Sequence, residues 1–214
     1  MSEPIVILGN SGHARVIADM LESLPGYRIV GCLAPDCAAG GIPGVPNLGT
    51  DDYLPELIQS GVRYVVIAVG DNRLRLKLAS FAEHCGASLP VIVSPWAHVS
   101  PRARIGVGTV VMPGAVVNTG GDLGRCVVIN TGATVDHDCV IEDGVHVAPG
   151  CHLAGGVHLG AGVFLGVGCS VIPRRTIGAW TIVGAGAAVT ANLPEGVTAV
   201  GVPARVLADR RIHS

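Results

Sequence analysis

Residues 129–159 read INTGATVDHDCVIEDGVHVAPGCHLAGGVHL, and every sixth residue of this stretch is Ile, Val or Leu. The same spacing holds without a break from Val93 to Val189, which makes seventeen consecutive positions. An α-helix repeats about every 3.6 residues and a half-buried strand every two, so neither accounts for this period. The pattern instead predicts a coil of short strands joined by tight corners.

Three of these six-residue units would close one triangular coil. Residues eighteen apart in sequence then become neighbours in adjacent strands, about 4.8 Å apart. The large aliphatic residue of each unit would point into the prism, and a small or β-branched residue four positions on would fit the corner. The seventeen units predict between five and six coils. Such a solenoid usually needs caps or neighbouring subunits to shield its apolar surface.

Residues 1–90 follow a different pattern. Apolar runs at 5–8, 28–33 and 64–69 predict strands, and periodic segments at 16–24, 51–60 and 74–84 predict helices. This alternation predicts a small, parallel, Rossmann-like α/β domain. The all-β solenoid domain, with a C-terminal cap, follows over residues 91–214.

Two polar loops follow strands of the predicted sheet, at residues 9–13 and 70–73. Ligands of parallel sheets settle at the carboxyl ends of the strands, where helix N-termini favour anions. The loops are therefore candidates for phosphate binding, although each could equally be a plain strand-to-helix turn. We interpret Arg73, Arg75 and Lys77 as the solvated face of the helix that follows the second loop.

Composition narrows the functional class. The 214 residues have a formal net charge of −2, which gives no basic surface for nucleic acid. No apolar stretch approaches the ~20 residues that span a bilayer, and the first residues show no signal-peptide pattern. The seven cysteines are scattered without a CxxC pair, so we expect unpaired thiols and a cytoplasmic location.

Four segments, spread over nearly the full length of the chain, resemble the sequences of one protein family: ILGNSGHARV, AVGDNRLR, NTGATVDHDCVIEDGVHVAPG and VGVPARV. The chain resembles bacterial sugar acetyltransferases with an N-terminal nucleotide-binding domain and a C-terminal left-handed β-helix of hexapeptide repeats. It is most similar to the N-acetyltransferases of nucleotide-linked 4-amino-4,6-dideoxy sugars, of the bacillosamine or perosamine type. The resemblance implies acetyl-coenzyme A as co-substrate, and a homotrimer with active sites at its subunit interfaces.

His137 is the favoured catalytic residue, because it stands at a corner between Asp136 and Asp138. Acyl transfer to an amine needs a general base, and imidazole has a suitable pKa. Either neighbouring carboxylate could orient the ring. The resemblance implies His137 as base and Asp138 as its partner. Gly155, eighteen residues on, leaves room for a thioester, and we expect its N–H to stabilise the oxyanion.

The resemblance also implies two sets of ligand contacts. Those to acetyl-coenzyme A would come from His146, Val167 and Ala185. Those to the nucleotide sugar would come from Ser11, Gly12, His13, Asp36 and Gly70. Asp36 stands where close relatives have a pair of acidic residues, so the choice between UDP and GDP stays open.

Three alternative functions are also compatible with the sequence. The first is O-acetylation of sialic acid or a related sugar, and the second is a non-catalytic scaffold. The third is a metalloenzyme like the γ-class carbonic anhydrases, suggested by His146, His152 and His158 at six-residue spacing. Successive units occupy different faces of the prism, so these imidazoles would diverge and no metal is expected within one subunit.

Overall fold

The computed structural model describes residues 2–35 and 41–208. Its internal contacts divide the chain into two compact units, Met1–Pro95 and Trp96–Ser214. Within the described ranges no helix is long and apolar enough to cross a bilayer.

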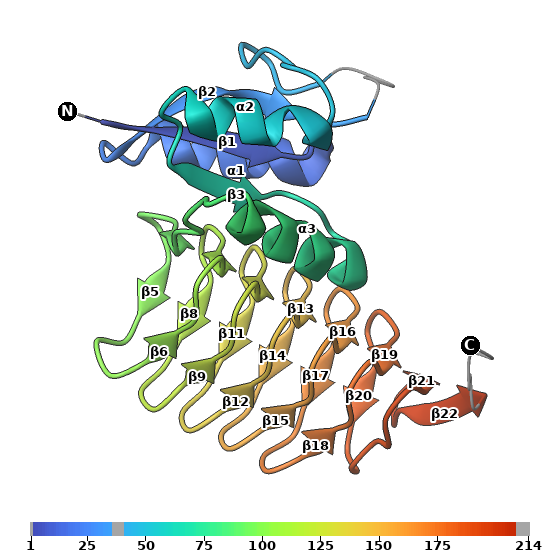
Figure 1. Ribbon diagram of the computed structural model, residues 1–214. Coiled ribbons are helices and arrows are strands. Elements are labelled where there is room, and N and C mark those ends of the chain that lie inside the picture. The colour runs from blue at the N-terminus through green and yellow to red at the C-terminus, as the bar shows by residue number, and fades with distance from the viewer. Residues whose placement is uncertain (1, 36–40, 209–214) are drawn as a thin grey trace. The chain divides into compact units, whose positions relative to one another are not determined.

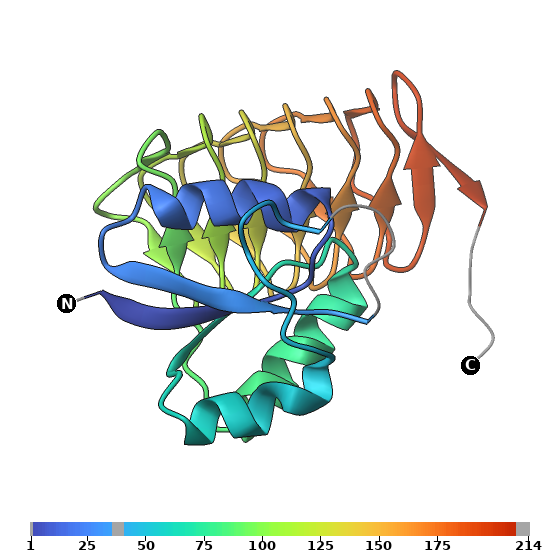
Figure 2. The same ribbon diagram turned by 90° about the horizontal axis from the view of Figure 1, so that it is seen from above.

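The first unit is built on a three-stranded parallel sheet in the order β2-β1-β3 (Figure 1). Helix α1 lies on one face of this sheet, and α2 and α3 lie on the other (Figure 2). The elements are β1 (Glu3–Leu8), α1 (Gly12–Glu22), β2 (Tyr27–Leu33), η1 (Asp51–Tyr53), α2 (Leu54–Gln59), β3 (Tyr64–Ile67), α3 (Asn72–His84) and β4 (Ile92–Val93). The predicted parallel α/β sheet is confirmed.

The sheet forms because its strands are almost wholly apolar. Ile5, Val6, Ile7 and Leu8 of β1 are completely buried, as expected of a central strand covered on both faces. The helix predicted over 51–60 begins as the 3-10 turn η1 and continues as α2. Pro55 lies in the first turn of α2, where its missing N–H removes no helical hydrogen bond.

The second unit is a parallel solenoid with three faces, which confirms the fold predicted from the six-residue period (Figure 1). The first face contains β7 (Val110–Val111), β10 (Val128–Ile129), β13 (His146–Val147), β16 (Phe164–Leu165), β19 (Ile182–Val183) and β21 (Thr198–Val200). The second contains β5 (His98–Val99), β8 (Val116–Val117), β11 (Thr134–Val135), β14 (His152–Leu153), β17 (Ser170–Val171) and β20 (Ala188–Val189). The third contains β6 (Arg104–Ile105), β9 (Asp122–Leu123), β12 (Val140–Ile141), β15 (His158–Leu159) and β18 (Thr176–Ile177). Strand β22 (Arg205–Ala208) pairs antiparallel with β21 at the end of the unit.

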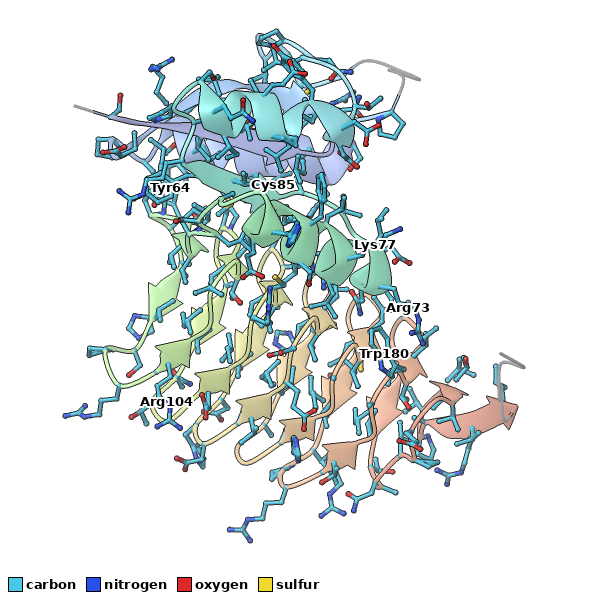
Figure 3. All side chains as sticks on the ribbon, viewed as in Figure 1. Tyr64, Arg73, Lys77, Cys85, Arg104 and Trp180 are labelled. Atoms are coloured by element: carbon cyan, nitrogen blue, oxygen red, sulfur yellow. The ribbon has the colours of Figure 1, made fainter. Side chains whose placement is uncertain are left out.

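Neighbouring strands of each face pair residues that are eighteen apart. Thr134 of β11, for example, lies between Val116 of β8 and His152 of β14. On the third face the same spacing joins Arg104 and Asp122 in an exposed ion pair of 2.6 Å (Figure 3). The stacking places every corner directly on the corner of the coil before it.

The inside of the prism is filled by the residues that set the period. From β7 to β20 the second residue of each strand points inward, as Val135 and Leu153 do, and is almost completely buried. Small corner residues such as Ala133, Cys139 and Cys151 are buried beside them. No disulfide forms among the six cysteines that the structure describes.

Candidate active site

Two corners of the solenoid hold the candidate residues. The His137 corner joins the second face to the third, and its successive turns are residues 118–121, 136–139, 154–157 and 172–175. The Asn130 corner joins the first face to the second, with turns at 112–115, 130–133, 148–151, 166–169 and 184–187. The second face lies between the two corners.

His137 and Asp138 form a hydrogen-bonded pair on the surface. Nδ1 of His137 lies 2.9 Å from Oδ2 of Asp138, and both side chains are more than half exposed. This hydrogen bond is the main reason why the pKa of His137 is raised above its ordinary value near 6.5, and the negative charge of Asp136 adds to the effect. With its Nδ1 proton directed to the carboxylate, the neutral ring presents Nε2 as its basic atom.

Asp136 holds the backbone rather than the ring. Its Oδ1 accepts hydrogen bonds from the His137 N–H, at 2.7 Å, and from Nδ2 of Asn118, at 3.0 Å. These two donors lower the pKa of Asp136, so it is a carboxylate at neutral pH. Of the two carboxylates, Asp138 contacts the imidazole and Asp136 fixes the turn.

Gly155 lies against the imidazole ring of His137, one coil on. A Cβ atom built on Gly155 would overlap Cε1 and Nε2 of the ring, so only glycine leaves the ring in this position. The Gly156 N–H donates to the His137 carbonyl at 2.9 Å. The Gly155 N–H has no acceptor among the residues that the structure describes.

His146, Val167 and Ala185 are not beside His137, because they lie on the first face or at the Asn130 corner. Val167 and Ala185 are exposed and stacked one coil apart at that corner. His146, on β13, is only 7% exposed and packs edge-on against Phe164 at a centroid distance of 5.2 Å. The structure thus places Val167 and Ala185 at one corner, His146 on the adjoining first face, and the expected base at another corner.

Asn130 is a candidate that sequence reasoning missed. Its Oδ1 accepts the Thr131 N–H at 2.8 Å, so its amide nitrogen faces Nε2 of His146 at 3.0 Å. On this hydrogen-bond network Nε2 of His146 is an acceptor and the ring proton is on Nδ1. The contact joins residues sixteen apart, on a strand and on the corner one coil before it. Only the stacking of the coils reveals such a pair.

In the first unit, Ser11, Gly12 and His13 lie where β1 passes into α1. Ser11 is the N-cap residue of α1, and its side chain makes no capping hydrogen bond. His13 is mostly buried, and burial, together with the charge of Arg75, lowers its pKa to about 4. His13 is therefore neutral at pH 7 and would meet a ligand as a hydrogen-bonding group rather than a cation.

The loop after β3 is held by Arg75, and here the sequence interpretation was wrong. Arg73 and Lys77 are exposed on α3 (Figure 3), but Arg75 is only 1% exposed. Its guanidinium donates to the carbonyls of Val69 and Gly70, each at 3.1 Å, and to Oδ1 of Asn72 at 2.9 Å. Asp36, the remaining expected contact of the nucleotide, lies outside the described residues.

His146, His152 and His158 lie on the first, second and third faces, as the spacing predicts. His152 contacts the Thr134 hydroxyl at 2.9 Å, and His158 contacts Glu142 at 2.8 Å. In the described part of the chain, no three His, Cys, Asp or Glu side chains are grouped so that they could hold a metal ion.

Comparisons with known proteins place the chain in one family. Residues 4–81 match the family model of the PglD N-terminal domain. The acetyltransferase domain of PglB from Neisseria gonorrhoeae FA1090, solved with acetyl coenzyme A, is 37% identical, with 97% of this chain and 100% of that chain covered and a TM-score of 0.89. PerB from Caulobacter crescentus, solved with CoA and GDP-perosamine, is 44% identical, with coverage of 96% and 97% and a TM-score of 0.92.

The fold and the site define a β-helix acyltransferase that depends on acetyl-coenzyme A. The chain belongs to the family of hexapeptide-repeat sugar acetyltransferases with a PglD N-terminal domain.

Proposed function

We propose that this enzyme transfers the acetyl group of acetyl-coenzyme A to the 4-amino group of a nucleotide-linked 4-amino-4,6-dideoxy sugar. The match to PerB, which was solved with CoA and GDP-perosamine, supports this acceptor class. The observation that carries the chemistry is the exposed His137–Asp138 pair. The raised pKa of His137 suits a base that works near neutral pH.

The reaction follows from the basic nitrogen of His137. Nε2 takes a proton from the sugar amine while the amine nitrogen attacks the thioester carbonyl, which forms the C–N bond and moves an electron pair onto the carbonyl oxygen. The Gly155 N–H donates a hydrogen bond to that oxyanion. Collapse of the intermediate breaks the C–S bond, and the imidazolium returns its proton to the departing thiolate. Asp138 stabilises the imidazolium throughout.

The first unit binds the nucleotide in this proposal. The start of α1, next to Ser11 and Gly12, has no side-chain cap, and a helix N-terminus of this kind is suited to a diphosphate. His13 and Gly70 complete the contacts, with neutral His13 as a hydrogen-bonding partner.

A homotrimer accounts for the separation of the two corners. The turn that bears His137 and those that bear Val167 and Ala185 lie at opposite edges of the second face. Each strand of the second face runs from one corner to the other, so the turn that bears His137 does not meet those that bear Val167 and Ala185 within one chain. In a closed threefold ring, the His137 corner of each chain meets the Asn130 corner of the next. His146, Val167 and Ala185 of one chain then hold the coenzyme that His137 of its neighbour uses.

We assign the reaction to the cytoplasm. The six described cysteines are all outside disulfides, which is the usual state in a reducing compartment.

The test of this function is an acceptor comparison. Coenzyme A release is measured with UDP-linked and GDP-linked 4-amino-4,6-dideoxy sugars and with sialic acid, and the product is analysed by NMR for the acetylated atom. Acetylation of N4 on either nucleotide sugar is expected. Turnover on sialic acid alone would replace the proposal with O-acetylation, and absence of turnover with every acceptor would contradict it.

A further inference from the structure

The turn at 118–121 lies one coil before the turn that bears His137. Val117 of β8 pairs with Val135 of β11, so residues 118, 119 and 120 stack on residues 136, 137 and 138. The Asp138 N–H donates to the Thr119 carbonyl at 3.1 Å, which ties the two turns together.

Gly120 borders the carboxylate of Asp138. A Cβ atom on Gly120 would overlap Oδ1 of Asp138 and would lie 3.4 Å from its Cγ and its backbone nitrogen. The other oxygen, Oδ2, is the atom that contacts Nδ1 of His137. The carboxylate therefore lies between Gly120 and the imidazole, and a side chain at position 120 would displace it.

The backbone cannot move the carboxylate out of the way. Asp138 has φ of 58°, in the left-handed region, and its N–H is fixed to Thr119. Its side chain would have to rotate instead, and rotation breaks the contact with Nδ1.

Asn118 acts on the other carboxylate of the corner. Its amide donates to Oδ1 of Asp136, the same atom that accepts the His137 N–H. The turn at 118–121 thus affects both acidic neighbours of His137. Asn118 donates a hydrogen bond to Asp136, and Gly120, which has no side chain, leaves space for the carboxylate of Asp138.

We propose that Gly120 and Asn118 are positioning residues for the acetyl transfer: Gly120 keeps open the space in which Asp138 meets His137, and Asn118 fixes Asp136 under the His137 backbone. The inference rests on the proposed function, since it requires His137 to be the base.

The test compares Gly120→Ala with Gly196→Ala. Gly196 has φ of 69°, against 72° for Gly120, and a Cβ there meets nothing within 4 Å. Gly196 lies in the turn before β21, away from the His137 corner and the Asn130 corner. Both variants therefore place an alanine in the left-handed region, at a similar cost in stability, but only Gly120→Ala disturbs Asp138. The pH profile of kcat/KM, the KM for acetyl-coenzyme A and the melting temperature are measured for each.

Gly120→Ala is expected to lower kcat by ~10-fold or more and to move the acid limb of the profile to lower pH, with little change in KM. Gly196→Ala is expected to melt at a similar temperature to Gly120→Ala with a wild-type profile. In an Asp138→Ala background, Gly120→Ala should have no further effect on kcat, because the carboxylate that it would displace has already been removed. Asn118→Ala should lower kcat without changing KM.

An unshifted profile for Gly120→Ala, or losses that multiply in the Asp138→Ala background, would overturn the inference. These outcomes require an active wild-type enzyme, so they are distinct from failure of the proposed function, in which the wild type itself transfers no acetyl group.

Discussion

The side chain of His137 is set up by its own neighbours in sequence, each through a different contact. Asp138 contacts the ring nitrogen, and Asp136 contacts the backbone N–H. Both raise the pKa of the imidazole, whereas the charge of Arg174 opposes them. A base whose pKa lies above its ordinary value is stronger, but it is protonated over a wider pH range.

Asp138→Asn tests this arrangement. The wild-type kcat/KM should fall as pH drops through a value above about 6.5, because the imidazole must be neutral to accept a proton. Asparagine removes the negative charge and weakens the hydrogen bond that raises the pKa most, so the acid limb should move to lower pH while the plateau falls by ~10-fold or more. A pH series of kcat/KM measures both. If the limb stays in place, Asp138 does not control the base.

The corner is the structural element that assembles the site. The turns at 136–139, 154–157 and 172–175 each hydrogen-bond to the turn before, so a side chain in one coil depends on a gap or a donor in an adjacent coil. Gly120 and Gly155 provide such gaps on the two sides of the pair. The sequence predicted Gly155 because the eighteen-residue period is regular.

Gly155→Ala should disturb the ring without unfolding the solenoid. The added Cβ overlaps the imidazole of His137, which is exposed and has room to turn outward. We expect kcat to fall by ~10²-fold or more, because the base and the oxyanion donor are both displaced. Coenzyme binding, measured by calorimetry, should be unchanged, since the Asn130 corner is not altered. Wild-type kcat would exclude Gly155 from the site.

The elements themselves were predictable because their patterns are local and repeated. A period of six fixes the strands, the inward residues and the stacking register, and the buried Val135 and Leu153 follow it. Contacts between side chains of different coils were not predictable. Asn130 and Asn118 look like ordinary corner residues until the coils are stacked. Arg75 was misplaced because helical spacing does not show that this one side chain in the first turn of α3 is buried.

At the scale of the whole molecule, the proposed function uses two units and two corners. In this proposal the first unit provides a helix N-terminus for the nucleotide, and the solenoid provides the base and the coenzyme contacts. Since the base and the coenzyme residues lie at opposite edges of the second face, a complete site requires the neighbouring chain of the proposed trimer.

Mixed trimers test this claim most directly. His137→Ala removes the base, and Ala185→Trp blocks the exposed coenzyme corner; each variant alone should lose at least 10²-fold in coenzyme A release. When the two are coexpressed and assemble at random, three trimers in four are mixed and each has one intact site of three, so about one quarter of wild-type turnover should return. Near-normal turnover of His137→Ala alone, or a mixture no more active than its parents, would contradict the account.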